Sequence, residues 1–325
     1  MRLKNKKILI TGGTGSLGQA LIKRLKTLGA KIYVYSRDEG KQALLFGSDP
    51  SITRIIGDIR DFDKLNVSLK NHKVDYIIHT AALKRIDDME FYPDECVKTN
   101  IIGSENVAKA ASLNNIEKCI LVSTDKACKP VNVYGSSKFI AERIFTNYDY
   151  NSDYTKFSSV RYGNVIASRG SFIPLFIDWI KNEQTIKVTS EEMTRFMFTL
   201  EDAVDAVMGT FHHMQGGEVF VPQIDSYTLP TCIKALSKML GKEAKTEVIG
   251  LRPGEKLHED MLAETELDFS YQVKSKNLIQ IRPQYSNRIY KNKGFEKYTG
   301  PHFNSELWVK EDISLVIDLI HRGLK

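Results

Sequence analysis

Short apolar runs and amphipathic helical segments alternate along the first half of the chain. Apolar runs that end in a turn predict buried parallel strands, and they cover residues 7–11, 31–35, 52–56, 75–80, 118–122 and 157–162. Apolar residues at helical spacing predict helices between them, at residues 17–28, 62–69, 94–114 and 134–146. This order predicts an α/β fold, a doubly wound parallel sheet whose ligands bind beyond the carboxyl ends of the strands.

A glycine-rich loop joins the first predicted strand to the first helix. Its sequence GGTGSLG places Gly12, Gly15 and Gly18 at the spacing of a dinucleotide site. The first glycine permits the tight turn, the second lets the backbone approach a pyrophosphate, and the third allows close packing of the helix on the strand. We therefore expect a Rossmann-type cofactor site. The other loop residues expected at the cofactor are Thr14, Ser16 and Leu17.

The end of the second strand indicates which form of the cofactor binds. Sites for NAD usually carry a carboxylate at this place, which binds the ribose 2′-hydroxyl. Here Ser36 and Arg37 follow the strand, and a hydroxyl with a guanidinium suits a 2′-phosphate. We therefore expect NADP, with Lys41 as a further phosphate ligand. The alternative is that Arg37 pairs with Asp38 or Glu39 at the surface.

Residues at the other strand ends are candidates for contacts with the cofactor or for structural roles. Asp58, followed by Ile59, could touch the adenine ring or cap the next helix. Ala81 and Ala82 follow the fourth strand and are small enough for a cofactor to lie against the backbone. Asn100, in the long helical segment, could support the active site or pack as a structural residue.

Residues 123–138, with the sequence STDKACKPVNVYGSSK, carry the residues of greatest chemical interest. Tyr134 and Lys138 are spaced i to i+4, so a helix would place them on one face, where the ammonium lowers the pKa of the phenol. Such a tyrosine can act as a base. Asp125 and Lys126 add an acid and a second base, which hydride transfer alone does not require. This excess of proton-transfer groups indicates a reaction beyond simple oxidation.

The pattern changes after about residue 168 and becomes less regular. Helices are predicted at residues 172–180, 200–211, 229–240 and 311–320, and short strands at residues 185–188, 217–221 and 246–249. We expect residues 1–168 to form the NADP-binding Rossmann domain, with residues 200–223 returning to it. Residues 169–199 and 224–325 are expected to form a smaller mixed α/β region that binds the substrate. Residues 271–304 give no clear pattern.

Composition and charge argue against several classes of function. The net charge of +6 is spread along all 325 residues, so no basic patch for nucleic acid is expected. The four cysteines lack CxxC spacing, and His212 with His213 lacks further ligands, so neither disulfides nor a metal site is expected. His79 is predicted to be a hydrogen-bonded core residue. No apolar run is long enough for a signal peptide or a membrane span, and we expect a cytoplasmic protein.

Taken together, the motifs resemble those of the extended short-chain dehydrogenase/reductases, and among them the soluble UDP-N-acetylglucosamine 4,6-dehydratases of polysaccharide biosynthesis. The motifs are TGGTGSLG, SRDE, HTAA, STDKA, YGSSK, RYGNV, MTRF and RPGEKLHE. The resemblance covers about residues 5–265. The glycine loop and the YxxxK pattern are common to the whole superfamily, whereas STDKA with AALK, MTRF and RPGEK is far more specific.

The resemblance implies a cycle of oxidation, elimination and reduction on one sugar. NADP+ would take hydride from carbon 4 while Tyr134 accepts the hydroxyl proton, with Thr124 holding the oxygen and Lys138 binding the nicotinamide ribose. Lys126 would remove the carbon 5 proton, and Asp125 would protonate the leaving 6-hydroxyl before the hydride returns to carbon 6. Lys126 must then be neutral and Asp125 protonated, and the chain must leave extended geometry for both to reach one sugar.

The resemblance also implies where the nucleotide-sugar binds. Arg252 and Glu255 flank a Pro-Gly turn, where they could bind phosphate and ribose or form a surface salt bridge. The residues expected around the UDP are Asn164, Arg195, Arg252 and Glu255, with Lys84 and Ser171 near the sugar or diphosphate and Lys84 also near the cofactor.

The loop after AALK departs from the family pattern, which leaves part of the reaction open. Arg85, Ile86 and Asp87 stand where a basic or polar residue, an aliphatic residue and a proline are common. The configuration at carbon 5 of the product is therefore left open between retention and inversion. The alternatives are a UDP-sugar epimerase of the same fold and a non-catalytic NADP-binding scaffold. In each case a homo-oligomer is expected.

Overall fold

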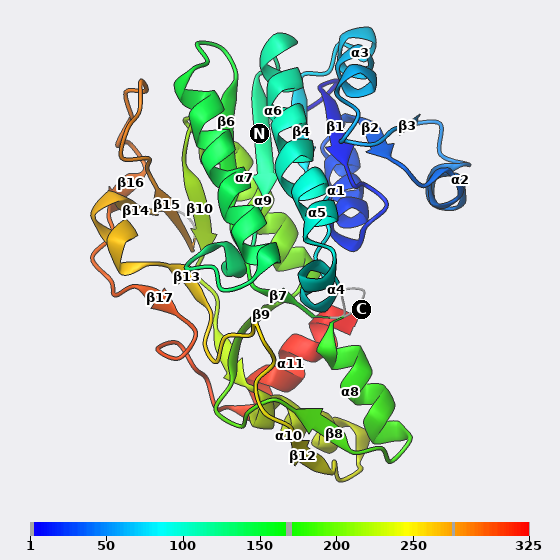
Figure 1. Ribbon diagram of the computed structural model, residues 1–325, viewed down its shortest axis with the longest axis vertical. Coiled ribbons are helices and arrows are strands. Elements are labelled where there is room, and N and C mark those ends of the chain that lie inside the picture. The colour runs from blue at the N-terminus through cyan, green and yellow to red at the C-terminus, as the bar shows by residue number, and fades with distance from the viewer. Residues whose placement is uncertain (1–2, 167–170, 275–276, 325) are drawn as a thin grey trace.

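The computed structural model describes residues 3–166, 171–274 and 277–324 and is built on one large sheet (Figure 1). The strands of this sheet lie in the order β16-β14-β15-β10-β6-β5-β4-β1-β2-β3. They are β1 (Lys7–Thr11), β2 (Lys31–Ser36), β3 (Ile52–Ile56), β4 (Tyr76–His79), β5 (Lys118–Val122), β6 (Lys156–Val160), β10 (Val219–Pro222), β14 (Ser270–Val273), β15 (Leu278–Ile281) and β16 (Phe295–Lys297). The strands predicted at residues 7–11, 52–56 and 118–122 are confirmed to the residue.

The winding of the sheet changes direction at β1. The strands β2 and β3 follow on one side and β4, β5, β6 and β10 on the other, and all of them are parallel. The register pairs Thr11 with Tyr35 and with His79, so the carboxyl ends of β1, β2 and β4 lie side by side. Such a change of direction opens a crevice for ligands at that edge. The predicted doubly wound Rossmann-type sheet is therefore confirmed.

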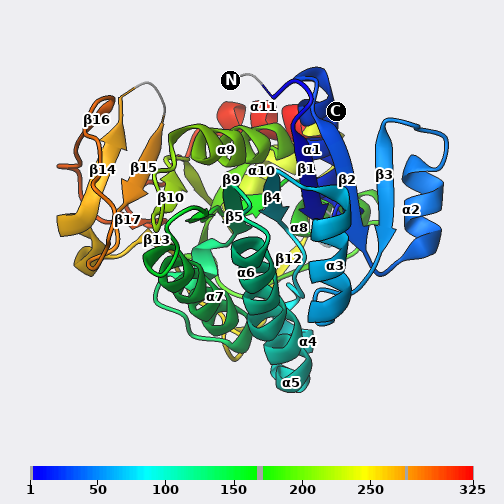
Figure 2. The ribbon, with the colours of Figure 1, turned by 90° about the horizontal axis from the view of Figure 1, so that it is seen from above.

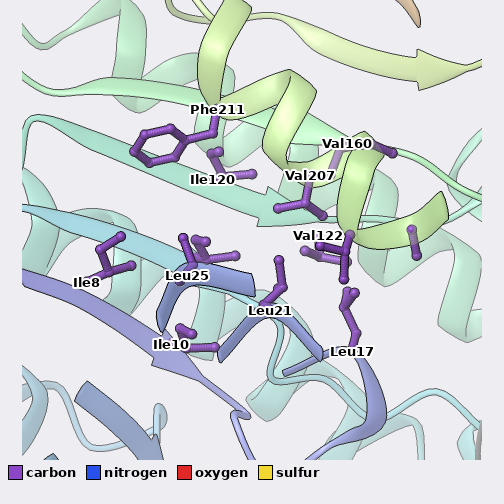
Figure 3. Close-up of a cluster of buried hydrophobic side chains, with 14 of the residues drawn as sticks. Ile8, Ile10, Leu17, Leu21, Leu25, Ile120, Val122, Val160, Val207 and Phe211 are labelled. Carbon is purple, nitrogen blue, oxygen red and sulfur yellow. The ribbon is translucent and has the colours of Figure 1, made fainter. Parts of the chain in front are cut away.

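Helices cover both faces of the sheet (Figure 2). The helices α1 (Ser16–Thr27) and α9 (Leu200–His213) lie on one face, and α3 (Phe62–His72), α6 (Gly103–Leu113) and α7 (Val133–Tyr150) lie on the other. Leu17, Leu21 and Leu25 of α1 pack against Ile8 and Ile10 of β1, as their helical spacing predicted (Figure 3). Each fully buried leucine contributes about 1.5–3 kcal/mol to stability. The shorter α2 (Glu39–Phe46) lies beside the edge strand β3.

The helix predicted at residues 94–114 is not one regular α-helix. It consists of α5 (Pro93–Cys96), a π-helical turn (Val97–Ile102) and α6, and it follows the short α4 (Ile86–Phe91). A π-helical turn widens the backbone and often marks a functional position. The turn contains Asn100, whose side chain is buried. The apolar spacing could not reveal this turn, because helical segments directly precede and follow it and the pattern is helical throughout.

The second half of the chain builds a smaller mixed α/β lobe below the sheet in Figure 1. The lobe has its own core, to which Ile173, Phe176 and Leu236 contribute. Its elements are α8 (Phe172–Lys181), α10 (Leu229–Leu240), α11 (Ile313–Leu324), β8 (Ile186–Val188) and β12 (Thr246–Val248). The remaining elements are β7 (Asn164–Val165), β9 (Thr194–Phe198), β11 (Ser226–Thr228), β13 (Asp260–Leu262), β17 (Phe303–Asn304) and the 3₁₀ turns Asp125–Ala127 and Glu264–Phe269.

The second half also returns to the main sheet in two places. The helix α9 packs on the sheet beside α1, and β10 pairs in parallel with β6. The strands β14, β15 and β16 then extend the same sheet through antiparallel pairs that begin at β10. Residues 224–325 are thus divided between the sheet and the smaller lobe. The boundary expected between residues 168 and 169 lies outside the described residues.

Membrane spans, metal sites and disulfides were considered from the sequence. No helix in residues 3–166, 171–274 or 277–324 is long and apolar enough to cross a membrane. Over the same residues, no group of histidine, cysteine and acidic side chains has the arrangement of a metal site. Cys96, Cys119, Cys128 and Cys232 are buried free thiols.

Gly18 provides a test of how closely α1 must approach the glycine loop. A Cβ at Gly18 would lie 2.6 Å from the Gly13 Cα and 2.8 Å from the Gly12 carbonyl oxygen. We predict that Gly18→Ala lowers the free energy of unfolding by about 1–3 kcal/mol, because backbone atoms must move. Gly40→Ala is the matched control, since its Cβ would meet only an Asp38 oxygen at 3.6 Å. Urea denaturation measures both, and an equal effect of the two changes would contradict the prediction.

Candidate active site

The glycine loop after β1 lies against the strand end of β4. Gly12 has a φ of 67°, in the left-handed region that favours glycine. A Cβ at Gly12 would lie 2.8 Å from the backbone of Ala81, so no side chain fits between the two segments. The helix α1 has no side-chain cap at Gly15, and its first N–H groups suit a pyrophosphate. The loop therefore fits the dinucleotide that its sequence predicts.

Arg37 follows the end of β2 with 56% of its side chain exposed. Its guanidinium is 3.7 Å from Asp58, which already pairs with Arg60 at 2.7 Å. Asp38 instead caps α2 and pairs with Lys41 at 2.9 Å. Among the described residues, the distances therefore place Arg37 beside Asp58 and not in the alternative pair with Asp38 or Glu39. Binding of a 2′-phosphate by Arg37 stays a prediction, and the other expected phosphate ligand, Lys41, is paired with Asp38.

The neighbouring candidates for the cofactor have partners within the protein. The Ser36 hydroxyl oxygen accepts a hydrogen bond from Gln42 at 2.9 Å. Asp61 caps α3, so the alternative that Asp58 caps this helix is wrong. Contact of Asp58 with adenine stays a prediction, and Ile59 beside it is buried in the core under α3 and α6.

Asn100 connects the loop after β4 to α7. Its side-chain oxygen accepts a hydrogen bond from the Leu83 amide at 2.9 Å, and its side-chain nitrogen donates to the Leu83 carbonyl at 2.9 Å. The same nitrogen donates to the Ser137 hydroxyl at 3.0 Å. These contacts favour the structural alternative for Asn100. They fix the segment that carries Ala81 and Ala82 relative to the helix that carries Tyr134.

His79 is a hydrogen-bonded core histidine, as predicted. Its Nδ1 is 2.7 Å from the Thr11 hydroxyl, and its Nε2 is 3.0 Å from the Ser104 hydroxyl. Burial lowers the pKa of the imidazole to about 3, so the ring is neutral at physiological pH. Both nitrogens are used in holding β1, β4 and α6 together.

The chain leaves extended geometry at Asp125, as the expected chemistry requires. Thr124 is still extended, with φ of −153° and ψ of 158°, and Asp125–Ala127 then forms a 3₁₀ turn. The turn brings the Lys126 Nζ to 3.0 Å from the Asp125 Oδ1. The Thr124 hydroxyl donates to the same oxygen at 2.8 Å and the Lys126 amide at 2.9 Å. A strand would have sent these adjacent side chains to opposite faces.

The two oxygens of Asp125 differ in their surroundings. Oδ1 accepts all of the hydrogen bonds just described, whereas Oδ2 is buried without a hydrogen-bond partner among the described residues. Burial raises the pKa of this carboxyl, which favours its protonated form. One oxygen of the carboxyl is thus engaged by three donors, and the other is left without a partner among the described residues.

Lys126 has a second acidic partner that sequence reasoning missed. Glu259, with 2% of its side chain exposed, places Oε1 at 3.2 Å from the Lys126 Nζ. Burial opposes the charge of Lys126, but Asp125 and Glu259 outweigh it and raise the pKa of the ammonium. Lys126 is therefore a cation in this arrangement. Glu259 lies within the motif RPGEKLHE, but no local pattern distinguished it from its neighbours.

Tyr134 and Lys138 lie on α7, as their spacing predicted. Burial raises the pKa of Tyr134 to about 12, against the opposing effects of Lys126 and of a hydrogen bond with Thr124. The cation that favours the phenolate in this arrangement is Lys126. The tuning of the phenol by Lys138 stays a prediction. Burial lowers the pKa of Lys138 to about 8, which Glu142 partly offsets. The ammonium of Lys138 is therefore easily deprotonated.

Arg195 joins β9 to the segment that contains RPGEK. Its side chain is buried and donates to the carbonyls of Leu257 at 3.1 Å and Lys256 at 3.0 Å. Its guanidinium is 3.5 Å from Glu255 and 4.0 Å from Glu259. The structure thus brings the predicted substrate residues Arg195 and Glu255 together and connects them to Glu259 beside Lys126.

The segment after β4 contacts the second half of the chain through Asp87, in the first turn of α4. This carboxylate is 3.3 Å from the guanidinium of Arg252, and both side chains are more than half exposed. Asp87 is one of the residues that depart from the family pattern. Lys84 is exposed in the same segment. The altered segment therefore contacts a predicted UDP ligand, Arg252.

Two further predicted substrate residues, Asn164 and Ser171, each have a buried polar atom. The Asn164 side-chain oxygen, on β7, is buried and has no hydrogen-bond partner among the described residues. The same holds for the hydroxyl of Ser171, which precedes α8. Because buried polar atoms are normally paired, these two atoms suit a polar ligand.

Comparison with known proteins agrees with these motifs. The model of a family described as polysaccharide biosynthesis protein matches residues 8–281. The chain is 42% identical over 278 residues to a UDP-N-acetylglucosamine 4,6-dehydratase (inverting) of Campylobacter jejuni, covering 83% of this chain and 81% of the relative. It is 41% identical over 273 residues to a UDP-glucose 4-epimerase of Rickettsia bellii, covering 81% and 79% of the two chains.

A solved structure has the same fold over the whole chain. It is the X-ray structure of Pen from Bacillus thuringiensis, which is 34% identical, has a TM-score of 0.91, and covers 100% of this chain and 99% of that one. On the family match, the relatives and the motifs, the chain belongs to the polysaccharide biosynthesis protein family, within the extended short-chain dehydrogenase/reductases that its sequence resembles.

Proposed function

We propose that the protein is an NADP-dependent UDP-N-acetylglucosamine 4,6-dehydratase, a hydro-lyase. The observation that carries the proposal is the buried Asp125–Lys126 pair beside Tyr134, because elimination of water needs an acid and a base beyond those of oxidation. The relative of Campylobacter jejuni with this activity in its name supports the same substrate. A second candidate is an epimerase, which the name of the Rickettsia bellii relative favours.

The first residues to act are those around the sugar 4-hydroxyl. A bound nicotinamide supplies the acceptor and donor of the hydride, and the glycine loop, Arg37 and Lys138 would hold the cofactor. Tyr134 takes the hydroxyl proton, and Thr124 hydrogen-bonds with Tyr134 and orients the sugar oxygen. The positive charge of Lys126 favours the phenolate during this step.

The acid and the base for elimination arise from one proton transfer. Moving a proton from the Lys126 Nζ to the Oδ1 of Asp125, over 3.0 Å, converts the ion pair into an amine and a carboxylic acid with no change in net charge. The amine then takes the carbon 5 proton. The acid gives its proton to the 6-hydroxyl, which leaves as water. Both groups are thereby returned to the ammonium and carboxylate of the resting site.

The second half of the chain would bind the nucleotide. Arg195 and Arg252 supply positive charge for the diphosphate, Glu255 a carboxylate for the ribose, and Asn164 and Ser171 the unpartnered polar atoms. The proposal includes a cytoplasmic homo-oligomer, for which the exposed Phe91 and Tyr92 provide apolar surface.

The product formed from UDP-N-acetylglucosamine tests the proposed function. We predict a 4-keto product that has lost one water, formed without net reduction of NADP+, as seen by mass spectrometry and by absorbance of the reduced cofactor. Asp125→Asn should slow water loss by about 10²–10⁴-fold, because the general acid is removed, while UDP binding is kept. A product of unchanged mass would support the epimerase. Proton NMR in deuterated water then distinguishes retention from inversion at carbon 5.

The selectivity for NADP should depend on Arg37. We predict that Arg37→Gln weakens binding of NADP+ by at least about tenfold, because a charge-assisted contact to the 2′-phosphate is lost. Binding of NAD+ should change little. Isothermal titration of both cofactors measures this, with Arg54→Gln on the adjacent strand β3 as the control. Equal losses for NADP+ and NAD+ would show that Arg37 does not bind the 2′-phosphate.

The lowered pKa of Lys138 predicts a specific dependence of stability on pH. The pKa is about 8 in the folded protein and 10.5 for an ordinary lysine. Between these values the unfolded chain binds a proton that the folded chain has released, so the stability of the wild type rises with pH relative to Lys138→Met. The difference should change by about 3 kcal/mol from pH 7 to pH 11 in chemical denaturation. A constant difference would contradict the lowered pKa.

A further inference from the structure

The Lys126 ammonium contacts two buried carboxylates, and the proposed chemistry uses only one of them. Asp125 is its neighbour in the chain, whereas Glu259 comes from the segment that follows the Pro-Gly turn. Glu259 has only 2% of its side chain exposed, so its negative charge is held inside the protein. A buried carboxylate is costly unless nearby groups compensate it. Its presence beside the base therefore needs an explanation.

Glu259 is held firmly by its backbone. Its amide donates to the Ser305 hydroxyl at 2.8 Å, and its carbonyl accepts from the Ser305 amide at 2.8 Å. The Ser305 hydroxyl in turn is 2.6 Å from the hydroxyl of Thr194 on β9. The next residues form β13, which pairs with β17. The carboxylate is thus carried by paired strands, which fix a functional group more accurately than a free loop does.

The two oxygens of Glu259 are used unequally. Oε1 is 3.2 Å from the Lys126 Nζ and 4.0 Å from the Arg195 Nε. Oε2 is buried without a hydrogen-bond partner among the described residues, as is the Oδ2 of Asp125. The charged and titratable groups that act on Lys126 are Asp125, Glu259, Arg195 and Tyr134. Of these, Glu259 is an anion with no proposed part in proton transfer.

We propose that Glu259 is a positioning residue for the acid–base pair, and that its fixed negative charge sets the protonation of Asp125 and Lys126 together. This inference rests on the proposed dehydratase function. When the proton moves from Lys126 to Asp125, the attraction between these two charges is lost. Glu259 still accepts an N–H bond from the amine and keeps it in place. The negative charge of Glu259 also disfavours loss to solvent of the proton that Asp125 and Lys126 share.

Glu259→Gln tests the role of the charge, because glutamine keeps the size and the hydrogen-bond acceptor. Loss of the anion should lower the pKa of both members of the pair, so the pH profile of elimination should move to lower pH by at least about one unit. Elimination is measured as exchange of the carbon 5 proton with deuterated solvent. Oxidation at carbon 4 depends on Tyr134, whereas the Glu259 carboxylate contacts Lys126 and Arg195, so the pH profile of oxidation should not move.

Glu259→Asp tests the role of position, because it keeps the charge but withdraws the carboxylate by one methylene. The pH profile should stay near that of the wild type while kcat for elimination falls by about 10–100-fold, with KM nearly unchanged. Glu264→Gln is the control, since this carboxylate is 54% exposed and pairs with Lys129 outside the site. It should leave both kcat and the pH profile of elimination unchanged.

The outcomes separate this inference from the proposed function. A wild-type protein that forms no 4-keto product refutes the proposed function, and this inference with it. A wild-type protein that forms the product, together with a folded Glu259→Gln variant whose elimination profile does not move, overturns the role of Glu259 alone. If Glu259→Gln does not fold, as judged by thermal unfolding, Glu259→Asp decides, because a wild-type kcat for elimination would exclude a positioning role.

Discussion

The buried contact between Lys126 and Asp125 is the interaction on which the candidate site depends. Two charges removed from water lower the stability of a protein unless their geometry and hydrogen bonds compensate. Here the compensation comes from the 3₁₀ turn after β5, from the Thr124 hydroxyl and from Glu259. The same turn that satisfies the charges also directs both side chains to one place. The cost of burying the pair is therefore linked to the geometry that proton transfer needs.

A second buried group of charges fixes the elements around this pair. Arg161 follows β6, is 1% exposed, and pairs with Glu142 of α7 and with Glu266 beyond β13, each at 2.8 Å. Glu142 also accepts a hydrogen bond from the hydroxyl of Ser123, which precedes Thr124, at 2.6 Å. The network thus holds the sheet, α7 and the segment beyond Glu259 in one arrangement. Loss of one partner from such a group typically costs about 3–5 kcal/mol.

Elements with a strong local pattern could be predicted from the sequence. Elements and site residues that depend on contacts between distant parts of the chain could not. The bounds of the strands β1, β3 and β5 were predicted to the residue, because turn residues lie at the ends of their apolar runs. The strand β9 was not predicted, although all its residues are buried, because Thr194 and Arg195 interrupt the apolar pattern. Glu259 was missed for a related reason, since its partner Lys126 lies far away in the chain. The motifs indicated most of the candidate residues, and only the tertiary contacts added Glu259 to them.

The same contacts argue against treating binding and chemistry as separate functions of the two halves. Arg195 contacts Glu255, a predicted nucleotide ligand, and lies 4.0 Å from Glu259, which holds Lys126. The group that would bind the diphosphate and the group that would deprotonate carbon 5 therefore share neighbours. A diphosphate bound by Arg195 would attract the positive charge that Arg195 now shares with Glu259. The guanidinium would then offset less of the negative charge of Glu259, which acts on Lys126. Occupation of the nucleotide site thus has a direct electrostatic route to the acid–base pair.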